Sequence, residues 1–371
     1  MKKILLITRP IAPPWDEASK IFAYNLAKDA KGFEFSVLTP GKIEALPKHI
    51  QQIPIYTSNH PNLKLDQQAR LLKLIPLIKN FDLVHFMLTP NKLNALGFKL
   101  FLTRPSVKTV QTVATLREDL FADKDFKKIL FADLIVTYSD YAKNKLTKLG
   151  LKNVMRVYPG INLQNYCPAP KNLHAMEMFG IAQTDFVISY PGEYTRLGAT
   201  DDIASMLPKL FEKIPNAKFI FANRLKNEKD ALKKAQVVET LKKAGVLDKV
   251  VFTDTFGEMP KIYNLSDVVI FPARDMKGKF DVPLVVIEAM ACAKPVIISN
   301  LPILQEFSSN KNAVMIDPTK ENELLEAILD LFENPKKCAK IGETAKQYAT
   351  ANFGIREVAK QYEQAYHHLL S

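Results

Sequence analysis

A helix start close to a buried glutamate is the most chemically informative feature of the sequence. Between residues 263 and 306, an apolar strand is followed by a polar loop at 274–281, then by Pro283 and the apolar segment 284–293. Proline favours the first turn of a helix, and the free N–H groups of such a start suit a phosphate. Glu288 lies within this apolar helix. Its carboxylate must therefore either reach an exposed edge or hydrogen-bond a specific partner.

Two successive runs of alternating strands and helices position this segment. We expect a first domain at 1–162 and a second at 163–353, with the polar, proline-containing stretch 161–172 as the linker and a last amphipathic helix at 354–371. Alternation of this length predicts parallel sheets with right-handed crossovers. The 371 residues suffice for two domains that each bury their own core. The fold class is therefore α/β.

Two helices are expected to cover the sheet of the first domain. One spans 66–80, where Pro76 kinks or ends it. The other lies within 91–108, which mixes Leu and Phe with Lys and Arg at helical spacing. This second pattern is typical either of an interfacial helix at a membrane or of a plain amphipathic helix on the sheet.

The positive charge is confined to the first half of the chain. Residues 1–160 hold 25 lysines and arginines against 13 acidic residues, whereas residues 161–371 hold 26 of each. A solvated basic face would explain this excess, and so would an acidic partner. No RNA-binding motif or zinc site is visible, so a nucleic acid is not expected. An anionic membrane surface or glycolipid fits better.

The termini and cysteines indicate the compartment. The first eight residues, MKKILLIT, read as a strand, because the apolar run stops at Arg9, too early for a signal peptide. No apolar run is long enough to span a bilayer. Cys167, Cys292 and Cys338 are odd in number and widely spaced, which indicates neither a disulfide framework nor a metal site. We expect a cytoplasmic protein.

The segment FPARDMKGKFDVPLVVIEAMACAKPVI resembles a hallmark of the retaining GT-B glycosyltransferases of family four, P-S-x-x-E-G-F-G-L-P-L-L-E-A-M-A-x-G-K-P-V-I. Glu288 matches the second Glu of the family's Glu-x7-Glu pair. Phe280 occupies the place of the first, and Asp281 follows it. VYPGINLQNYCP is similar to I-P-N-G-V-D-x-x-x-F-x-P, which marks the domain join in the family. The resemblance covers nearly the whole chain and implies two Rossmann-like domains facing a central cleft, with the last helix packed on the first domain.

The resemblance also implies which residues bind the donor. Glu288 would bind the nucleotide ribose, with a purely structural hydrogen bond as the alternative. Asp281 either grips the donor sugar in place of the missing Glu or caps a helix. The family's phosphate-binding G-R-L-x-x-x-K-G is altered here to GEYTRLGA, so Arg196, Arg224 and Lys226 are the candidate cations unless they are surface charges. The expected catalytic set is Asp281, Glu288 and Arg196, and the expected donor-binding set is Gly192, Arg196, Arg224, Lys226, Thr255, Phe256, Asp281, Val282, Pro283, Leu284 and Glu288.

The acceptor side is expected in the first domain. The family's Gly-Gly loop is replaced by PPWDEASK, where Trp15 would stack on a sugar or cap the core, and Asp16 would face the site or cap the next helix. The family histidine falls at Ala114 and is missing, with Arg117 nearby. His85 ends a strand and either points at the cleft or is a hydrogen-bonded strand-end histidine.

The implied function is a retaining, metal-independent hexosyltransferase. Such an enzyme would move a sugar from a nucleotide sugar to a glycan or glycolipid in cell-envelope synthesis, with no cofactor and in contact with the inner face of the cell membrane. Helix N-termini and basic side chains would stabilise the diphosphate. The alternatives are a non-catalytic relative that binds a glycan or a partner subunit, and a nucleotide-sugar epimerase of the same fold.

Overall fold

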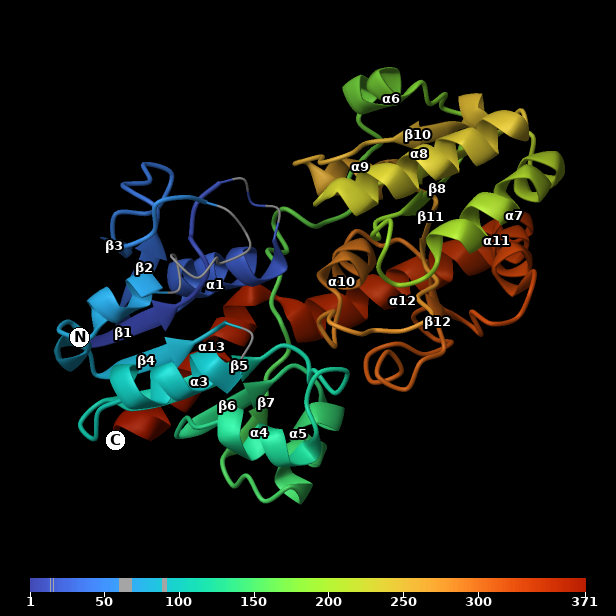
Figure 1. Cartoon of the computed structure of the whole chain (residues 1–371). Coiled ribbons are helices and arrows are strands. Elements are labelled where there is room, and N and C mark those ends of the chain that lie inside the picture. The colour runs from blue at the N-terminus through green and yellow to red at the C-terminus, as the bar shows by residue number, and fades with distance from the viewer. Residues whose placement is uncertain (14, 16, 60–68, 89–91) are drawn as a thin grey trace. The chain divides into compact units, whose positions relative to one another are not determined.

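The computed structural model describes residues 1–13, 15, 17–59, 69–88 and 92–371, and the chain folds into two compact units (Figure 1). Unit 1 comprises Met1–Asn162, Gly278–Asp281 and Phe353–Ser371. Unit 2 comprises Leu163–Lys277 and Val282–Asn352. The linker expected at 161–172 contains the point where the first unit ends.

Unit 1 is built on a parallel seven-stranded sheet in the order β3-β2-β1-β4-β5-β6-β7. The strands have the valine-, isoleucine- and leucine-rich sequences expected of a sheet covered on both faces. Their bounds are β1 Lys2–Ile7, β2 Phe33–Thr39, β3 Gln51–Pro54, β4 Leu83–Phe86, β5 Lys108–Val113, β6 Leu134–Thr137 and β7 Val154–Arg156.

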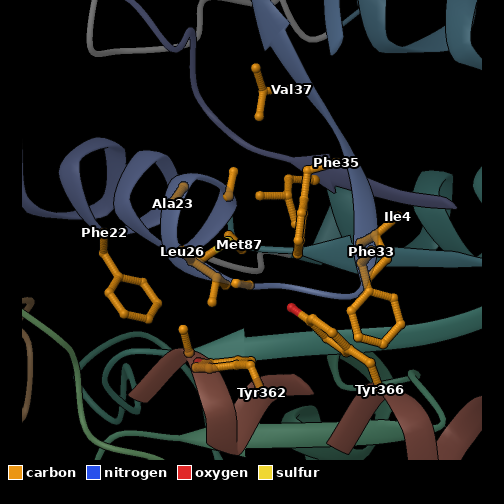
Figure 2. Close-up of a cluster of buried hydrophobic side chains, with 14 of the residues drawn as sticks. Ile4, Phe22, Ala23, Leu26, Phe33, Phe35, Val37, Met87, Tyr362 and Tyr366 are labelled. Carbon is orange, nitrogen blue, oxygen red and sulfur yellow. The ribbon is translucent and has the colours of Figure 1, made fainter. Parts of the chain in front are cut away.

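The helices of unit 1 cover this sheet, and the last helix of the chain is one of them. They are α1 Ala18–Asp29, η1 Leu71–Leu74, η2 Ile78–Asn80, α3 Lys92–Gly97, η3 Phe98–Leu102, α4 Asp123–Ile129, α5 Asp140–Lys148 and α13 Ile355–Leu370. Figure 2 shows Tyr362 and Tyr366 of α13 directed towards Phe22 and Phe33. All four rings belong to one buried apolar cluster. The amphipathic pattern of α13 therefore anchors the chain's end on unit 1.

Unit 2 is built on a parallel six-stranded sheet in the order β10-β9-β8-β11-β12-β13. Its strands are β8 Phe186–Tyr190, β9 Ala217–Phe221, β10 Val250–Phe252, β11 Val268–Phe271, β12 Val296–Ser299 and β13 Val314–Ile316. Its helices are α6 Leu173–Phe179, α7 Thr200–Lys213, α8 Glu228–Lys243, η4 Leu247–Lys249, α9 Met259–Leu265, α10 Leu284–Ala291, α11 Glu323–Glu333 and α12 Pro335–Phe353. Two parallel sheets with alternating helices confirm the α/β prediction.

The two helices expected over the first sheet are not continuous α-helices in the described residues. Residues 69 and 70 are α-helical, and the chain then forms the 3₁₀ turns η1 and η2, separated by a turn that contains Pro76; residues 66–68 lie outside the described part. The basic segment forms α3, then the π-helical turn η3, which ends at Leu102. Pro105 follows within three residues, and a residue that precedes a proline disfavours the helical conformation.

Candidate functional site

The sheet of unit 2 has a switch point beside β8, whose neighbours are β9 and β11. At such a point successive connections leave towards opposite faces of the sheet, and ligands of open α/β folds bind outside the carboxyl ends of the strands. The loops after β8 and β11 meet there, because the Arg274 backbone N–H donates to the Leu197 carbonyl at 2.8 Å. Candidate donor residues 192–198 therefore stand at the position where a ligand is expected.

Glu193 forms ion pairs with two cations at this edge of the sheet. Its buried carboxylate lies 3.3 Å from Nε of Arg196 and pairs through its other oxygen with Nζ of Lys226. Burial lowers the pKa of Lys226, and the neighbouring charge of Arg224 lowers it further, although Glu193 opposes both. The structure thus brings together the three cations predicted from two separate loops. Sequence reasoning treated Glu193 only as a substitution and missed that it pairs with Arg196 and Lys226.

Gly192 is required by its surroundings. A Cβ at this position would lie 2.0 Å from Cζ of Tyr190, so only glycine fits. The Gly192 N–H donates to Oδ1 of Asn223 at 3.1 Å, and Asn223 is fully buried. Its Nδ2 has no hydrogen-bond partner within the described residues. Asn223 was missed from the sequence, where an asparagine after a strand reads as an ordinary loop residue.

Arg274 is a further cation that the sequence did not single out. It donates two hydrogen bonds to Asp202 in the first turn of α7, at 2.8 and 2.7 Å. Its side chain also packs 3.2 Å from where a Cβ of Gly198 would lie, and Gly198 has a φ of +67°. Arg274 therefore joins the loop after β11 to the start of α7.

Glu288 is buried on α10 and faces two tyrosines. The Tyr263 hydroxyl donates to Oε2 of Glu288 at 2.9 Å, and the Tyr166 hydroxyl is within hydrogen-bonding reach of the same carboxyl. Burial raises the pKa of Glu288 to about 7, although the two hydroxyls act in the opposite direction. The carboxyl therefore has specific partners inside the protein, which is one of the two arrangements that the sequence left open.

The remaining donor-side candidates also lie in unit 2. Val282 is buried, Pro283 is the N-cap residue of α10, and Leu284 begins that helix. Thr255 is exposed, whereas Phe256 is half-buried and makes an edge contact with Phe179 at a centroid distance of 5.6 Å. Phe256 thus has an apolar partner of its own.

Asp281 belongs to unit 1, unlike Glu288. Its N–H donates to the Ala114 carbonyl at 2.9 Å, and its carboxylate accepts a hydrogen bond from the Ser139 hydroxyl. Ser139 is the N-cap of α5 and also accepts from the Ala142 N–H. Asp281 therefore contacts the capping serine of α5 but is not itself a helix N-cap, because Pro283 holds that position at α10.

The acceptor-side candidates lie in unit 1, and each described one has its own partners there. Trp15 stacks on Tyr24 with ring centroids 4.6 Å apart, and Asp16 lies outside the described residues. Arg117 makes two hydrogen bonds to Asp119 and lines a small pocket of unit 1. His85 does not face a ligand site, because it is fully buried between the Thr112 and Tyr366 hydroxyls. The strand-end alternative therefore holds for His85.

The described residues contain neither a metal-binding cluster nor a membrane-spanning helix. No cluster of three or more histidine, cysteine or acidic side chains there has the arrangement of a metal site. In the same part of the chain, no helix combines the length and the apolar character that a membrane span needs.

Two family models together match most of the chain. Residues 175–348 match the family described as Glycosyl transferases group 1, and residues 21–165 match Glycosyltransferase Family 4. The chain belongs to the group 1 glycosyltransferases. This confirms the resemblance based on the segment around Glu288, and the two matches fall in the two successive halves expected from the sequence.

Two relatives illustrate the low sequence identity of the matching proteins. A GDP-mannose-dependent alpha-(1-6)-phosphatidylinositol monomannoside mannosyltransferase of Mycolicibacterium smegmatis is 24% identical over 238 residues, which cover 61% of this chain and 59% of the relative. The chain therefore spans less than two thirds of that protein. An uncharacterized glycosyltransferase of Methanocaldococcus jannaschii is 26% identical over 345 residues, 88% of this chain and 87% of the relative.

Solved structures confirm the GT-B fold. HepE of Anabaena in complex with UDP-glucose superimposes with a TM-score of 0.79, at 18% identity and with full coverage of both chains. Sucrose-phosphate synthase of Thermosynechococcus elongatus gives a TM-score of 0.76 at 18% identity, with 100% of this chain and 99% of the other covered. At these identities the likeness concerns the fold alone.

Proposed function

We propose that the chain transfers a sugar from a nucleoside diphosphate sugar to a hydroxyl group of a glycan or glycolipid. The main support is the cluster of Arg196, Arg224 and Lys226 at the switch point of unit 2. Beside it, Asn223 offers a buried N–H donor with no partner among the described residues. A diphosphate would add negative charge beside these cations and an acceptor oxygen for the Asn223 N–H.

The proposed reaction needs no protein nucleophile. The bond between the anomeric carbon and the diphosphate oxygen breaks, and the acceptor oxygen bonds to the anomeric carbon on the same face. The departing phosphate takes the acceptor's proton, so the configuration is retained. The protein's part is to position the donor and stabilise the charge that develops on the phosphate. The cations around Glu193 serve this purpose without a metal ion or a cofactor.

Names of similar proteins favour a nucleotide sugar as the donor. HepE is described in complex with UDP-glucose, and the mycobacterial relative is described as GDP-mannose-dependent. The second name also describes a phosphatidylinositol mannoside as the acceptor. We therefore place a glycolipid or envelope glycan first among the acceptors.

The proposal includes contact with the cytoplasmic face of an anionic membrane through unit 1. Leu96, Leu100 and Phe101 of α3 and η3 are 56%, 60% and 46% exposed. Lys92 and Lys99 are exposed in the same segment. Apolar side chains among cations match an interface of acyl chains and anionic headgroups. The excess of lysine and arginine over residues 1–160 would likewise attract an anionic surface.

The test of the activity is incubation of the purified chain with UDP- and GDP-sugars and lipid or glycan extracts. We expect release of UDP or GDP that depends on the acceptor, and a labelled sugar in the product. Nucleotide binding without release or transfer would contradict the enzymatic proposal.

A second candidate function is a non-catalytic module that binds a glycan or partner. Phe280 favours it, because this residue stands where the family has a glutamate and makes an edge contact with Tyr138 at 5.3 Å. Binding without turnover in the test above would support this candidate.

A further inference from the structure

Unit 1 contains a small cavity of about 70 Å³ at the carboxyl ends of β1, β4, β5 and β6. The loop 278–281, which belongs to unit 1, forms part of its wall. The Asp281 N–H of this loop donates to the Ala114 carbonyl at 2.9 Å, and Phe280 makes an edge contact with Tyr138 at a centroid distance of 5.3 Å. The cavity is therefore enclosed by side chains and backbone of one compact unit.

The wall of this cavity carries two cations. Arg9 follows β1 and Arg117 follows β5, and no acidic residue lies among the described residues that line the cavity. Arg9 is oriented by an ion pair with Glu17. Arg117 is oriented by two hydrogen bonds to Asp119, at 2.8 and 2.7 Å. Neither carboxylate is part of the wall, and an arginine has five N–H donors, so these pairs leave donors on both guanidinium groups.

Tyr138 contributes a third donor to the wall. Its side chain is 1% exposed, and its ring is held between Phe22 and Phe280 by edge contacts at 5.7 and 5.3 Å. Among the described residues its hydroxyl makes no hydrogen bond, and burial raises the pKa of Tyr138 well above its ordinary value, so the hydroxyl keeps its proton. A buried O–H without an acceptor is costly, and a ligand in the cavity would supply one.

The chemistry and the size of the cavity together select a carboxylate. Two further hydroxyls of the wall are already engaged, since Ser19 donates to Glu17 at 2.9 Å and Thr112 is hydrogen-bonded to His85 at 2.7 Å. The wall thus offers N–H and O–H donors with positive charge, which match a group that only accepts. A cavity of about 150 Å³ holds the six carbons of benzene. About 70 Å³ therefore has room for about three heavy atoms, the number in a carboxylate.

We propose that this cavity of unit 1 binds the carboxylate of a sugar acid, such as a hexuronate, carried by the acceptor or by the donor. The inference rests on the proposed function and narrows its substrates to acidic sugars. Arg9 and Arg117 pair with the carboxylate oxygens, and Tyr138 donates to one of them. Because a hydroxymethyl group brings no charge to the guanidinium groups, the cavity distinguishes a uronate from the corresponding neutral sugar.

The test compares methyl β-D-glucuronide with methyl β-D-glucoside, which differ only in a carboxylate against a hydroxymethyl group, by NMR titration at physiological salt. We expect wild type to bind the glucuronide about tenfold more tightly, because its hydrogen bonds are charge-assisted. Arg117→Gln should abolish most of this preference, and Tyr138→Phe, which keeps the ring, should lower it about threefold. Lys128→Gln removes the same charge from an exposed position on α4 and should retain the preference.

Equal affinity for the two glycosides, or a preference that Arg117→Gln and Tyr138→Phe both leave intact, would overturn the carboxylate site. Tighter binding of glucose 6-phosphate than of the glucuronide would overturn it as well, because the cavity would then take a phosphate.

Transfer assays identify the substrate that carries the group. One arm compares UDP-glucuronate with UDP-glucose as donor, and the other compares glucuronide with glucoside acceptors. A preference for the acid in either arm supports the site, whereas transfer without preference in both arms contradicts it. Preferential binding of the glucuronide without any sugar transfer would leave the site in place and contradict the proposed function.

Discussion

Each unit buries one titratable group among tyrosine hydroxyls, but the two groups are held in opposite ways. His85 of β4 lies in a chain of hydroxyls that runs from Tyr366 through the imidazole to Thr112 and Tyr362. Burial lowers its pKa to about 3, so the ring is neutral and both nitrogens are engaged. Burial raises the pKa of Glu288 to about 7.

The difference shows that burial does not by itself mark a functional group. The partners of His85 lie inside the core and on α13, and all of them are buried. One partner of Glu288 lies on an irregular, partly exposed stretch. His85 thus ties a terminal helix to a sheet, whereas one partner of Glu288, Tyr166, lies outside any helix or strand.

The largest effect should come from breaking the His85 chain. His85→Ala leaves Thr112 and Tyr366 unpaired in the core and opens a cavity, which should lower the unfolding free energy of unit 1 by about 3 kcal/mol. Trp15 is the chain's single tryptophan and lies in unit 1, so its fluorescence during urea unfolding reports this unit. UDP or GDP affinity should stay unchanged. If His85→Ala folds but loses nucleotide binding, His85 is not the purely structural group that distinguishes it from Glu288.

The next effect is on stability, which should depend on pH with opposite sign in the two units. Glu288 has a raised pKa, so the folded state holds its proton more tightly than the unfolded chain. The stability it adds is present below about pH 4.5 and is lost as the pH rises through about 7, a change of about 2 to 3 kcal/mol. Unfolding of wild type and Glu288→Gln between pH 5 and 8 should show the difference.

His85 should produce the reverse slope, because its folded pKa lies below the unfolded value. Its contribution is present above about pH 6.5 and falls as the pH drops towards 3. Tryptophan fluorescence separates this slope from that of Glu288. If the unfolding free energy changes with pH in the same way in wild type and in Glu288→Gln, Glu288 does not titrate with a shifted pKa. The same comparison with His85→Ala tests His85.

A smaller effect tests the cations of unit 2. Arg196→Ala should weaken UDP or GDP binding about tenfold and leave the free nucleoside unaffected, because only the diphosphate meets the guanidinium. Lys243→Ala is the matched control, since Lys243 is 76% exposed and pairs with Glu239 on the same helix. Equal losses for nucleotide and nucleoside would argue against a phosphate role for Arg196.

The smallest effect concerns the basic surface of unit 1. Binding to vesicles with anionic lipid should fall with salt, and Lys99→Glu should reduce it several-fold, at about 1 kcal/mol per charge near the surface. Leu100→Ser should act in the same direction. Leu232→Ser, on the 65% exposed Leu232 of unit 2, should have no effect. Salt-independent binding would remove the membrane part of the proposal.

Local sequence was sufficient for most of the elements. The resemblance to the family's phosphate-binding loop pointed to Arg196, Arg224 and Lys226, and the loops that carry them follow parallel strands that end at one edge of the sheet. The local pattern was less accurate at 66–80, where residues 69 and 70 are α-helical but 3₁₀ turns flank Pro76.

The sequence by itself determined the α/β architecture, through the alternation of strands and helices, and the family, through the resemblance of the segment around Glu288 to a known motif. Only the tertiary structure decided the partners of each buried group. It placed His85 in a core chain, attached Asp281 to the capping serine of α5 and set two tyrosines on Glu288. The partners of these groups lie from 25 to 281 positions away in the chain, so no local pattern could pair them.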